Sequence, residues 1–145
     1  MEKQLQTIPI NTRIKLAFLW TSMIGLWIYA DFFQLFTPFK LKNMLDMKGP
    51  FGETTPETLV YYSILLILPT LMIAGSILLK SVLSKWINII MALFYTLISV
   101  LILFDSWGDK WLSFYILYQI IEIFVFALIV WYAWNWPSKN QKNSK

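Results

Sequence analysis

The chain of 145 residues is 58% hydrophobic and 18% aromatic, and only 14% of it is charged. Soluble domains are about half apolar and about a quarter charged, so this composition excludes an ordinary soluble protein. The net charge of +4 would suit a nucleic acid. However, the basic residues lie beside long apolar runs, which is typical of membrane topology signals, and we expect no nucleic-acid partner.

Histidine and cysteine are both absent. Their absence excludes disulfide exchange, cysteine nucleophiles, thiolate metal sites, histidine-ligated haem and histidine proton shuttles. Glycine-rich phosphate loops, metal-ligand spacings and nucleophile elbows are missing as well. We therefore expect no catalytic residues, no metal and no cofactor, and the balance favours a protein that is not an enzyme.

Four apolar runs have no basic residue in their interiors, and each approaches or exceeds the ~20 residues that a helix needs to cross a bilayer. They predict membrane spans at approximately 15–37, 58–79, 86–105 and 112–135. The first run is too long for a signal-peptide core and lacks a cleavage site, so we expect it to remain a span. Residues 1–145 then form a single, all-α membrane domain, an antiparallel four-transmembrane-helix bundle.

The first span is expected to end before Pro38, because the residue ahead of a proline resists helical geometry. The outer loop 39–57 is the one long connection. Within it, apolar residues at helical spacing with lysines between them predict a short helix along the membrane interface; they are Leu41, Met44 and Leu45. The stretch KGPFGE that follows predicts a turn.

The second span begins at a clear signal, with Thr55 as N-cap and Pro56 at the first helical position. Pro69 lies near its middle and leaves the carbonyl of Leu65 without its usual helical partner, which favours a kink. Gly75 and Ser76 are interpreted as small residues that permit close helix approach.

The basic residues divide unequally between the two sides of the membrane. The larger group comprises Lys3, Arg13, Lys15, Lys80, Lys85, Lys139, Lys142 and Lys145, and the smaller group comprises Lys40, Lys42, Lys48 and Lys110. By the positive-inside rule both termini are cytoplasmic, and the polar tail at 138–145 is expected to be disordered. We predict a multi-pass protein of the cell inner (plasma) membrane, with the bilayer itself as a partner.

Two carboxyl groups lie inside spans. Asp31 is roughly 8 Å and Glu122 roughly 15 Å below the outer ends of their helices, from the rise of about 1.5 Å per residue. Side chains lean toward the N-terminus of their own helix, so Asp31 leans deeper and Glu122 shallower. If the first and last spans are neighbours, the two acids approach each other.

Other polar side chains share the faces of these two acids. The predicted cluster in the outer half of the bundle comprises Asp31, Glu122, Gln119, Tyr115, Trp27, Gln34, Tyr95 and Ser99, with Thr96 and Ser63 as further candidates. No basic residue lies in any span as a counter-ion, so we expect Glu122 to be neutral at pH 7 and to donate to Asp31, a tyrosine or Gln119.

Three interpretations of this cluster stay open. The first is interhelical hydrogen bonding that stabilises helix packing, at about 0.6 kcal/mol per bond. The second is a pocket for a small or lipid-like ligand that carries a cation, an amine or a hydroxyl group. The third is a small proton-coupled transporter with Glu122 as its proton site.

The strings WIYAD at 27–31, NII at 88–90 and IEIFVFALIVWYAWNWP at 121–137 resemble a bacterial family of small four-span membrane proteins of unknown function, near the DoxX-like group. The resemblance implies a four-helix bundle in the inner membrane. Through the DoxX-like group it also implies an alternative function, as the membrane subunit of a quinone-linked oxidoreductase. A quinone, a membrane protein partner and a second copy of the chain are therefore further candidate partners.

Overall fold

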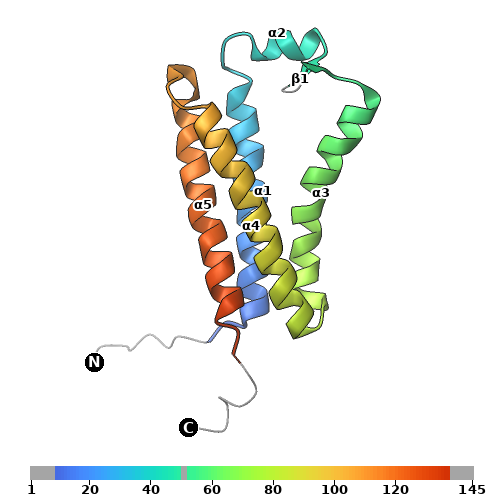
Figure 1. The fold of residues 1–145 in the computed structure, drawn as a ribbon, viewed down its shortest axis with the longest axis vertical. Coiled ribbons are helices and arrows are strands. Elements are labelled where there is room, and N and C mark those ends of the chain that lie inside the picture. The colour runs from blue at the N-terminus through green and yellow to red at the C-terminus, as the bar shows by residue number, and fades with distance from the viewer. Residues whose placement is uncertain (1–8, 50–51, 138–145) are drawn as a thin grey trace, which may run out of the picture.

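The structure, a computed structural model, describes residues 9–49 and 52–137. This part of the chain contains four long helices: α1 (Thr12–Gln34), α3 (Pro56–Leu78), α4 (Ser81–Asp105) and α5 (Ser113–Trp134), the last preceded by the short 3-10 helix η1 (Lys110–Leu112). All four are long and apolar enough to cross a membrane, which confirms the four expected long apolar helices and is compatible with an all-α membrane bundle. They run alternately up and down the molecule (Figure 1), so α1 begins and α5 ends at the same end.

Several expectations concern residues that lie outside this description. They are the disordered tail at 138–145, the basic residues Lys3, Lys139, Lys142 and Lys145, and the residues at 50–51 of the predicted turn.

The long connection lies across the end of the bundle opposite to the start of α1, called here the α2 end (Figure 1). It contains the predicted short helix, α2 (Lys40–Leu45), whose apolar side chains are exposed as an interfacial helix requires. The predicted turn is part of a small antiparallel ladder between β1 (Lys48–Gly49) and β2 (Gly52–Glu53). The ladder depends on a glycine, since Gly52 has a φ of +115°, which other residues rarely adopt.

The helix starts follow from local capping. Thr55 and Thr58 form a reciprocal capping box: the Thr58 N–H donates to the Thr55 hydroxyl oxygen at 3.3 Å, and the Thr55 N–H donates to the Thr58 hydroxyl oxygen at 2.8 Å. This confirms Thr55 as the N-cap. Helix α1 begins at Thr12, ahead of the expected span, because the Asn11 side chain accepts from the N–H of Arg13 at 3.0 Å.

Pro69 and Tyr95 are linked through one backbone carbonyl. The proline cannot donate to the carbonyl of Leu65, as the sequence predicts. In the structure the Tyr95 hydroxyl of α4 donates to that carbonyl at 2.6 Å. Helix α3 is continuous through Pro69, and the backbone hydrogen bond lost there is replaced by one from a side chain of the neighbouring helix, which is how membrane helices tolerate proline.

We expect Tyr95→Phe to lower the free energy of unfolding by about 1 kcal/mol, because the Leu65 carbonyl then loses its donor. In a Pro69→Leu background the same substitution should cost little, since the restored N–H at position 69 donates to this carbonyl. Unfolding by titration with sodium dodecyl sulfate in micelles measures both effects. Tyr29→Phe is the control, because Tyr29 is 61% exposed. Equal costs of Tyr95→Phe in both backgrounds would contradict the link.

Basic side chains close two helix ends at the opposite end of the bundle. Arg13 donates to the carbonyl of Ile77 at 2.5 Å and to the Ser81 hydroxyl at 3.0 Å, where α3 ends and α4 begins. Lys85 donates to the carbonyl of Trp134, the last residue of α5, at 3.0 Å. Cations are favourable at helix C-termini, so these residues stabilise the fold in addition to any effect on topology.

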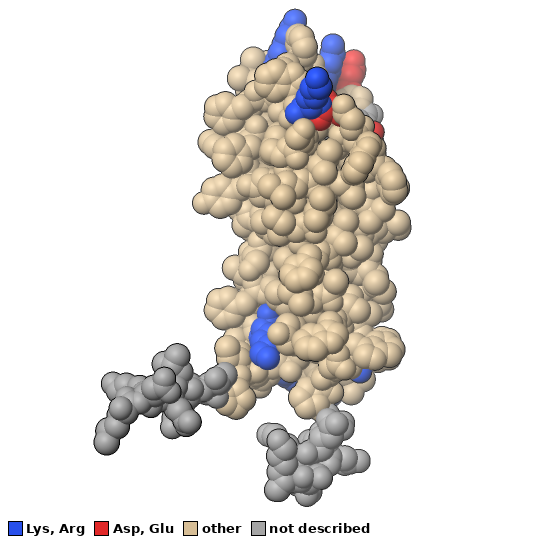
Figure 2. Space-filling view, turned by 90° about the vertical axis from the view of Figure 1, so that its left-hand side faces the viewer, with Lys and Arg blue, Asp and Glu red and all other residues tan. Residues whose placement is uncertain are grey.

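The surface agrees with a membrane location. In the face shown in Figure 2, charged side chains gather near the α2 end and near the opposite end, with a wide uncharged band between them. Many large apolar side chains of the long helices are exposed, for example Leu71 at 59%, Leu97 at 59% and Phe124 at 63%. Such a surface requires an apolar solvent.

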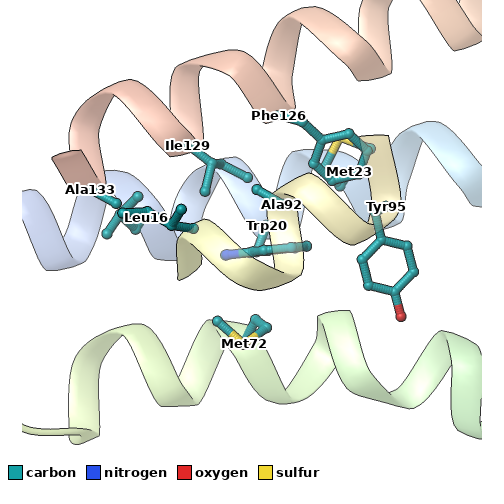
Figure 3. Packing of buried hydrophobic residues seen from close by; sticks show 10 residues of the cluster. Leu16, Trp20, Met23, Met72, Ala92, Tyr95, Phe126, Ile129 and Ala133 are labelled. Carbon is teal, nitrogen blue, oxygen red and sulfur yellow. The ribbon is translucent and has the colours of Figure 1, made fainter. Parts of the chain in front are cut away.

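The core lies where α1 packs between α3 and α5. Trp20 and Met23 of α1 meet Phe126 of α5, Tyr95 of α4 and Met72 of α3 (Figure 3). The ring centroids of Trp20 and Phe126 are 5.9 Å apart, and the pair of α1 and α5 confirms that the first and last long helices are neighbours. Helix α3 diverges from the other long helices toward the α2 end (Figure 1), where two cavities lie.

Candidate functional site

A small cavity lies between all four long helices, in the half of the bundle nearer α2. This deep pocket has a volume of about 120 Å³. Its polar lining consists of Trp27, Asp31, Tyr95, Ser99, Tyr115, Gln119 and Glu122, and apolar residues such as Ala30, Leu65 and Ile98 complete it. Of the predicted cluster, all residues except Gln34 therefore line one cavity.

Glu122 and Gln119 form the buried polar centre of the deep pocket, and each side chain is 2% exposed. The Ser99 hydroxyl donates to Glu122 Oε2 at 2.9 Å, and Gln119 Nε2 lies 3.4 Å from Glu122 Oε1, a long and weak hydrogen bond. The Trp27 indole also approaches this carboxyl group. Among the described residues, Gln119 Oε1 has no hydrogen-bond partner. A buried acceptor without a donor is costly and points to a missing donor.

Asp31 lies at the mouth of the deep pocket and is close enough to Glu122 for the two carboxyl groups to affect each other electrostatically. The Asp31 carboxyl group also interacts electrostatically with Lys40. Within the described part of the chain, the Asp31 carboxyl group and the Tyr115 hydroxyl make no hydrogen bond. The two acids therefore lie near each other, as expected, but no hydrogen bond joins them.

A second, larger cavity of about 660 Å³ lies beneath α2 and the β1–β2 ladder, and is called here the wide pocket. Its apolar lining includes Ile28, Phe32, Leu35, Met44, Met47 and Leu59, and its polar lining consists of Asp31, Gln34, Lys40, Lys48, Thr54 and Tyr62. Gln34 faces this cavity and not the deep pocket. Asp31 lines both cavities, so its side chain stands between them.

Toward the other end of the bundle, the deep pocket is bounded by packed aromatic rings. The Tyr95 and Phe126 rings stack with centroids 6.1 Å apart, and Trp20 meets Tyr95 edge-on at 6.3 Å. All three side chains are buried (Figure 3). The deep pocket therefore faces the α2 end.

A second buried polar cluster, which was not predicted from the sequence, lies beyond these rings. Asn88 Oδ1 accepts from Trp20 Nε1 at 2.7 Å and from the Ser76 hydroxyl at 3.1 Å, while Asn88 Nδ2 donates to the Ser84 carbonyl at 2.8 Å. The signal was a lone asparagine in an apolar helix. Because every polar group of Asn88 is paired, we interpret this cluster as a set of structural hydrogen bonds that joins α1, α3 and α4. Ser76 is therefore a hydrogen-bonding residue as well as a small one.

The two further candidates do not join either cluster. The Thr96 hydroxyl donates to the Ala92 carbonyl at 2.7 Å, and the Ser63 hydroxyl donates to the Leu59 carbonyl at 2.8 Å, in each case within the same helix. The described residues contain no group of histidine, cysteine, aspartate or glutamate side chains that could hold a metal ion.

Comparison with known proteins identifies a family. The family model described as a family of unknown function (DUF6326) matches residues 8–144. No curated protein and no protein of solved structure matches the chain. The match agrees with the predicted resemblance to a family of unknown function, and it carries no link to the DoxX-like group.

Proposed function

We propose a function from the two pockets themselves, because this chain belongs to DUF6326, a family whose function is unknown. The protein is a multi-pass membrane protein, without enzymatic activity, that binds a small or lipid-like ligand in the outer half of the bundle. The α2 end faces outward and both termini are cytoplasmic, in the inner (plasma) membrane. The polar side chains of the deep pocket also stabilise the helix packing.

The position of Asp31 carries this proposal. It lines both pockets, so a ligand that enters the wide pocket at the α2 end meets the polar lining of the deep pocket. The wide pocket, at about 660 Å³, falls within the usual range of roughly 300–1,000 Å³ for small-molecule sites. A mostly apolar lining with a few convergent polar groups is also typical of such sites.

The two other functions are less well supported. A quinone head group brings carbonyl acceptors, whereas the open groups of the deep pocket are mainly acceptors already. A proton-coupled transporter needs a route to both faces of the membrane, and buried rings of Trp20, Tyr95 and Phe126 lie on the path toward the opposite end.

Because the chain has no cysteine, single cysteines test pocket access directly. We expect Ser99→Cys in the deep pocket to react with a membrane-impermeant, positively charged methanethiosulfonate added from the outer side. Its rate should exceed that of Leu97→Cys on the lipid-facing side of the same helix by about tenfold or more, because the thiolate is the nucleophile and lipid disfavours it.

Right-side-out and inverted vesicles, followed by a gel-shift assay of unreacted thiols, measure these rates from each face. Leu59→Cys in the wide pocket is the positive control. A closed packing cluster would leave Ser99→Cys as unreactive as Leu97→Cys, and reaction only from the cytoplasmic side would overturn the proposed orientation.

A further inference from the structure

Three of the hydrogen-bond donors of the deep pocket are already in use. The Ser99 hydroxyl and the Gln119 amide donate to Glu122, and the Tyr95 hydroxyl donates to the Leu65 carbonyl outside the cluster. The donors that remain are the Tyr115 hydroxyl, the second N–H of the Gln119 amide and, when Glu122 is protonated, its O–H, while the indole of Trp27 lies near Glu122.

The acceptors, in contrast, are open. Gln119 Oε1 is buried without a partner, and the Asp31 carboxyl group has no donor among the described residues. A carboxylate offers about four lone-pair sites and an amide oxygen two. The missing component of this pocket is therefore a group with several hydrogen-bond donors.

The charged groups that line the deep pocket are unbalanced as well, in favour of negative charge. Two carboxyl groups face the deep pocket, and none of its lining residues is lysine or arginine. Lys40 lines only the wide pocket. The Trp27 and Tyr95 rings, with centroids 5.4 Å apart, add π-faces that attract a cation.

From these observations we infer that the deep pocket binds the protonated primary amine of a ligand whose apolar body lies in the wide pocket. The ammonium group donates to the Asp31 carboxylate and to Gln119 Oε1, and it lies beside the Glu122 carboxyl group. This inference rests on the proposed function and names its ligand class. An ammonium group with three N–H donors supplies both the charge and the donors that the lining lacks.

The sizes of the pockets are compatible with this division. The deep pocket, at about 120 Å³, is several times larger than the roughly 30 Å³ that a water molecule occupies in the liquid. It therefore has space for an ammonium group and a few neighbouring atoms. The apolar body has space beside Ile28, Phe32 and Met44 in the wide pocket. Asp31 lies where these two parts of the ligand join.

Hexylamine, protonated at pH 7, is the direct probe of this inference. We expect saturable binding by isothermal titration calorimetry to the full chain in phosphatidylcholine nanodiscs, with empty nanodiscs as the blank. Hexan-1-ol lacks the charge, and hexyltrimethylammonium has the charge without N–H donors; each should bind at least tenfold more weakly. Equal binding of either analogue, or no saturable binding of hexylamine, would overturn the inference.

Variants assign the binding to the deep pocket. Asp31→Asn and Gln119→Leu should each weaken hexylamine binding about tenfold or more, since hydrogen bonds to charged groups are stronger than those between neutral groups. Asp105→Asn is the matched control, because Asp105 is an exposed acid at the end of α4. Gln119→Glu retains an acceptor and should retain binding, which separates a lost contact from a lost fold. Wild-type affinity in Gln119→Leu would refute the assignment.

The amine has two natural sources, a lipid headgroup or a free organic amine. Nanodiscs that contain phosphatidylethanolamine distinguish them: competition with hexylamine identifies the headgroup, and undiminished binding identifies a free amine. Failure of the inference is also separable from failure of the proposed function. A reactive Ser99→Cys without amine binding refutes only the amine, whereas an unreactive Ser99→Cys refutes the open pocket.

Discussion

Trp20→Ala is expected to lower the free energy of unfolding by about 3–5 kcal/mol, the usual cost of removing a large buried aromatic side chain. Trp20 is fully buried, at 0% exposed, and lies at the centre of the core. Its ring meets those of Tyr95 and Phe126 edge-on, at 6.3 and 5.9 Å. Within a bilayer the helices are held by such packing, because lipid is as apolar as the core.

Titration with sodium dodecyl sulfate in mixed micelles, followed by circular dichroism, measures this loss. Trp131→Ala is the matched control, since Trp131 is 56% exposed. Trp20→Phe retains most of the packing and removes the indole N–H, so it should cost less than Trp20→Ala. If Trp20→Ala and Trp131→Ala were equally mild, the core described here would be wrong.

The second large effect is expected for Asn88→Ala, at about 1–3 kcal/mol, because it leaves buried polar groups without partners. The Trp20 indole loses its acceptor and the Ser84 carbonyl loses a donor, while Ser76 keeps its bond to the Met72 carbonyl at 2.7 Å. Thr96→Ala is the control, since its hydroxyl bonds only within its own helix, and it should cost less than 0.5 kcal/mol.

A double-mutant cycle tests whether Asn88 acts through Trp20. In the Trp20→Phe background no indole N–H is left to satisfy, so Asn88→Ala should cost less there than in the wild-type chain. Residues in one hydrogen-bond network typically couple by 0.5–3 kcal/mol. Strict additivity in the same unfolding assay would show that the two side chains contribute independently.

Local chemistry explains why much of the fold could be predicted. The four helices follow from apolar runs, because backbone groups in lipid must bond within the segment. The Thr55 cap, the helix at Lys40–Leu45 and the unpaired Leu65 carbonyl follow from residues close in sequence. The donor to that carbonyl could not be predicted, because Tyr95 comes from another helix and its rotation is set by packing.

The candidate site was predicted in part for the same reason. Helical spacing places Glu122 and Gln119 on one face of α5, and Asp31 lies on a polar face of α1. These residues approach each other as long as the two helices are neighbours. Gln34 was assigned to the same cluster on helical spacing, but in the structure it faces the wide pocket. The wide pocket forms because α3 diverges from the other long helices and because α2 and the β1–β2 ladder lie across the gap. Neither arrangement can be predicted from the spacing of apolar residues along the sequence.

By itself, the sequence determined that the chain has four helices long and apolar enough to cross a membrane, that it has no histidine or cysteine chemistry, and that the two acids of these helices lack a basic partner within the spans. These properties depend on composition and on contacts along a single helix. Tertiary structure alone decided which polar groups meet. It paired Asn88 with Trp20, gave Tyr95 to the Leu65 carbonyl, and left Gln119 Oε1 without a donor. The reason is physical: a hydrogen bond is gained or lost when the donor–acceptor distance changes by a few tenths of an ångström, and only the packing of whole helices sets that distance.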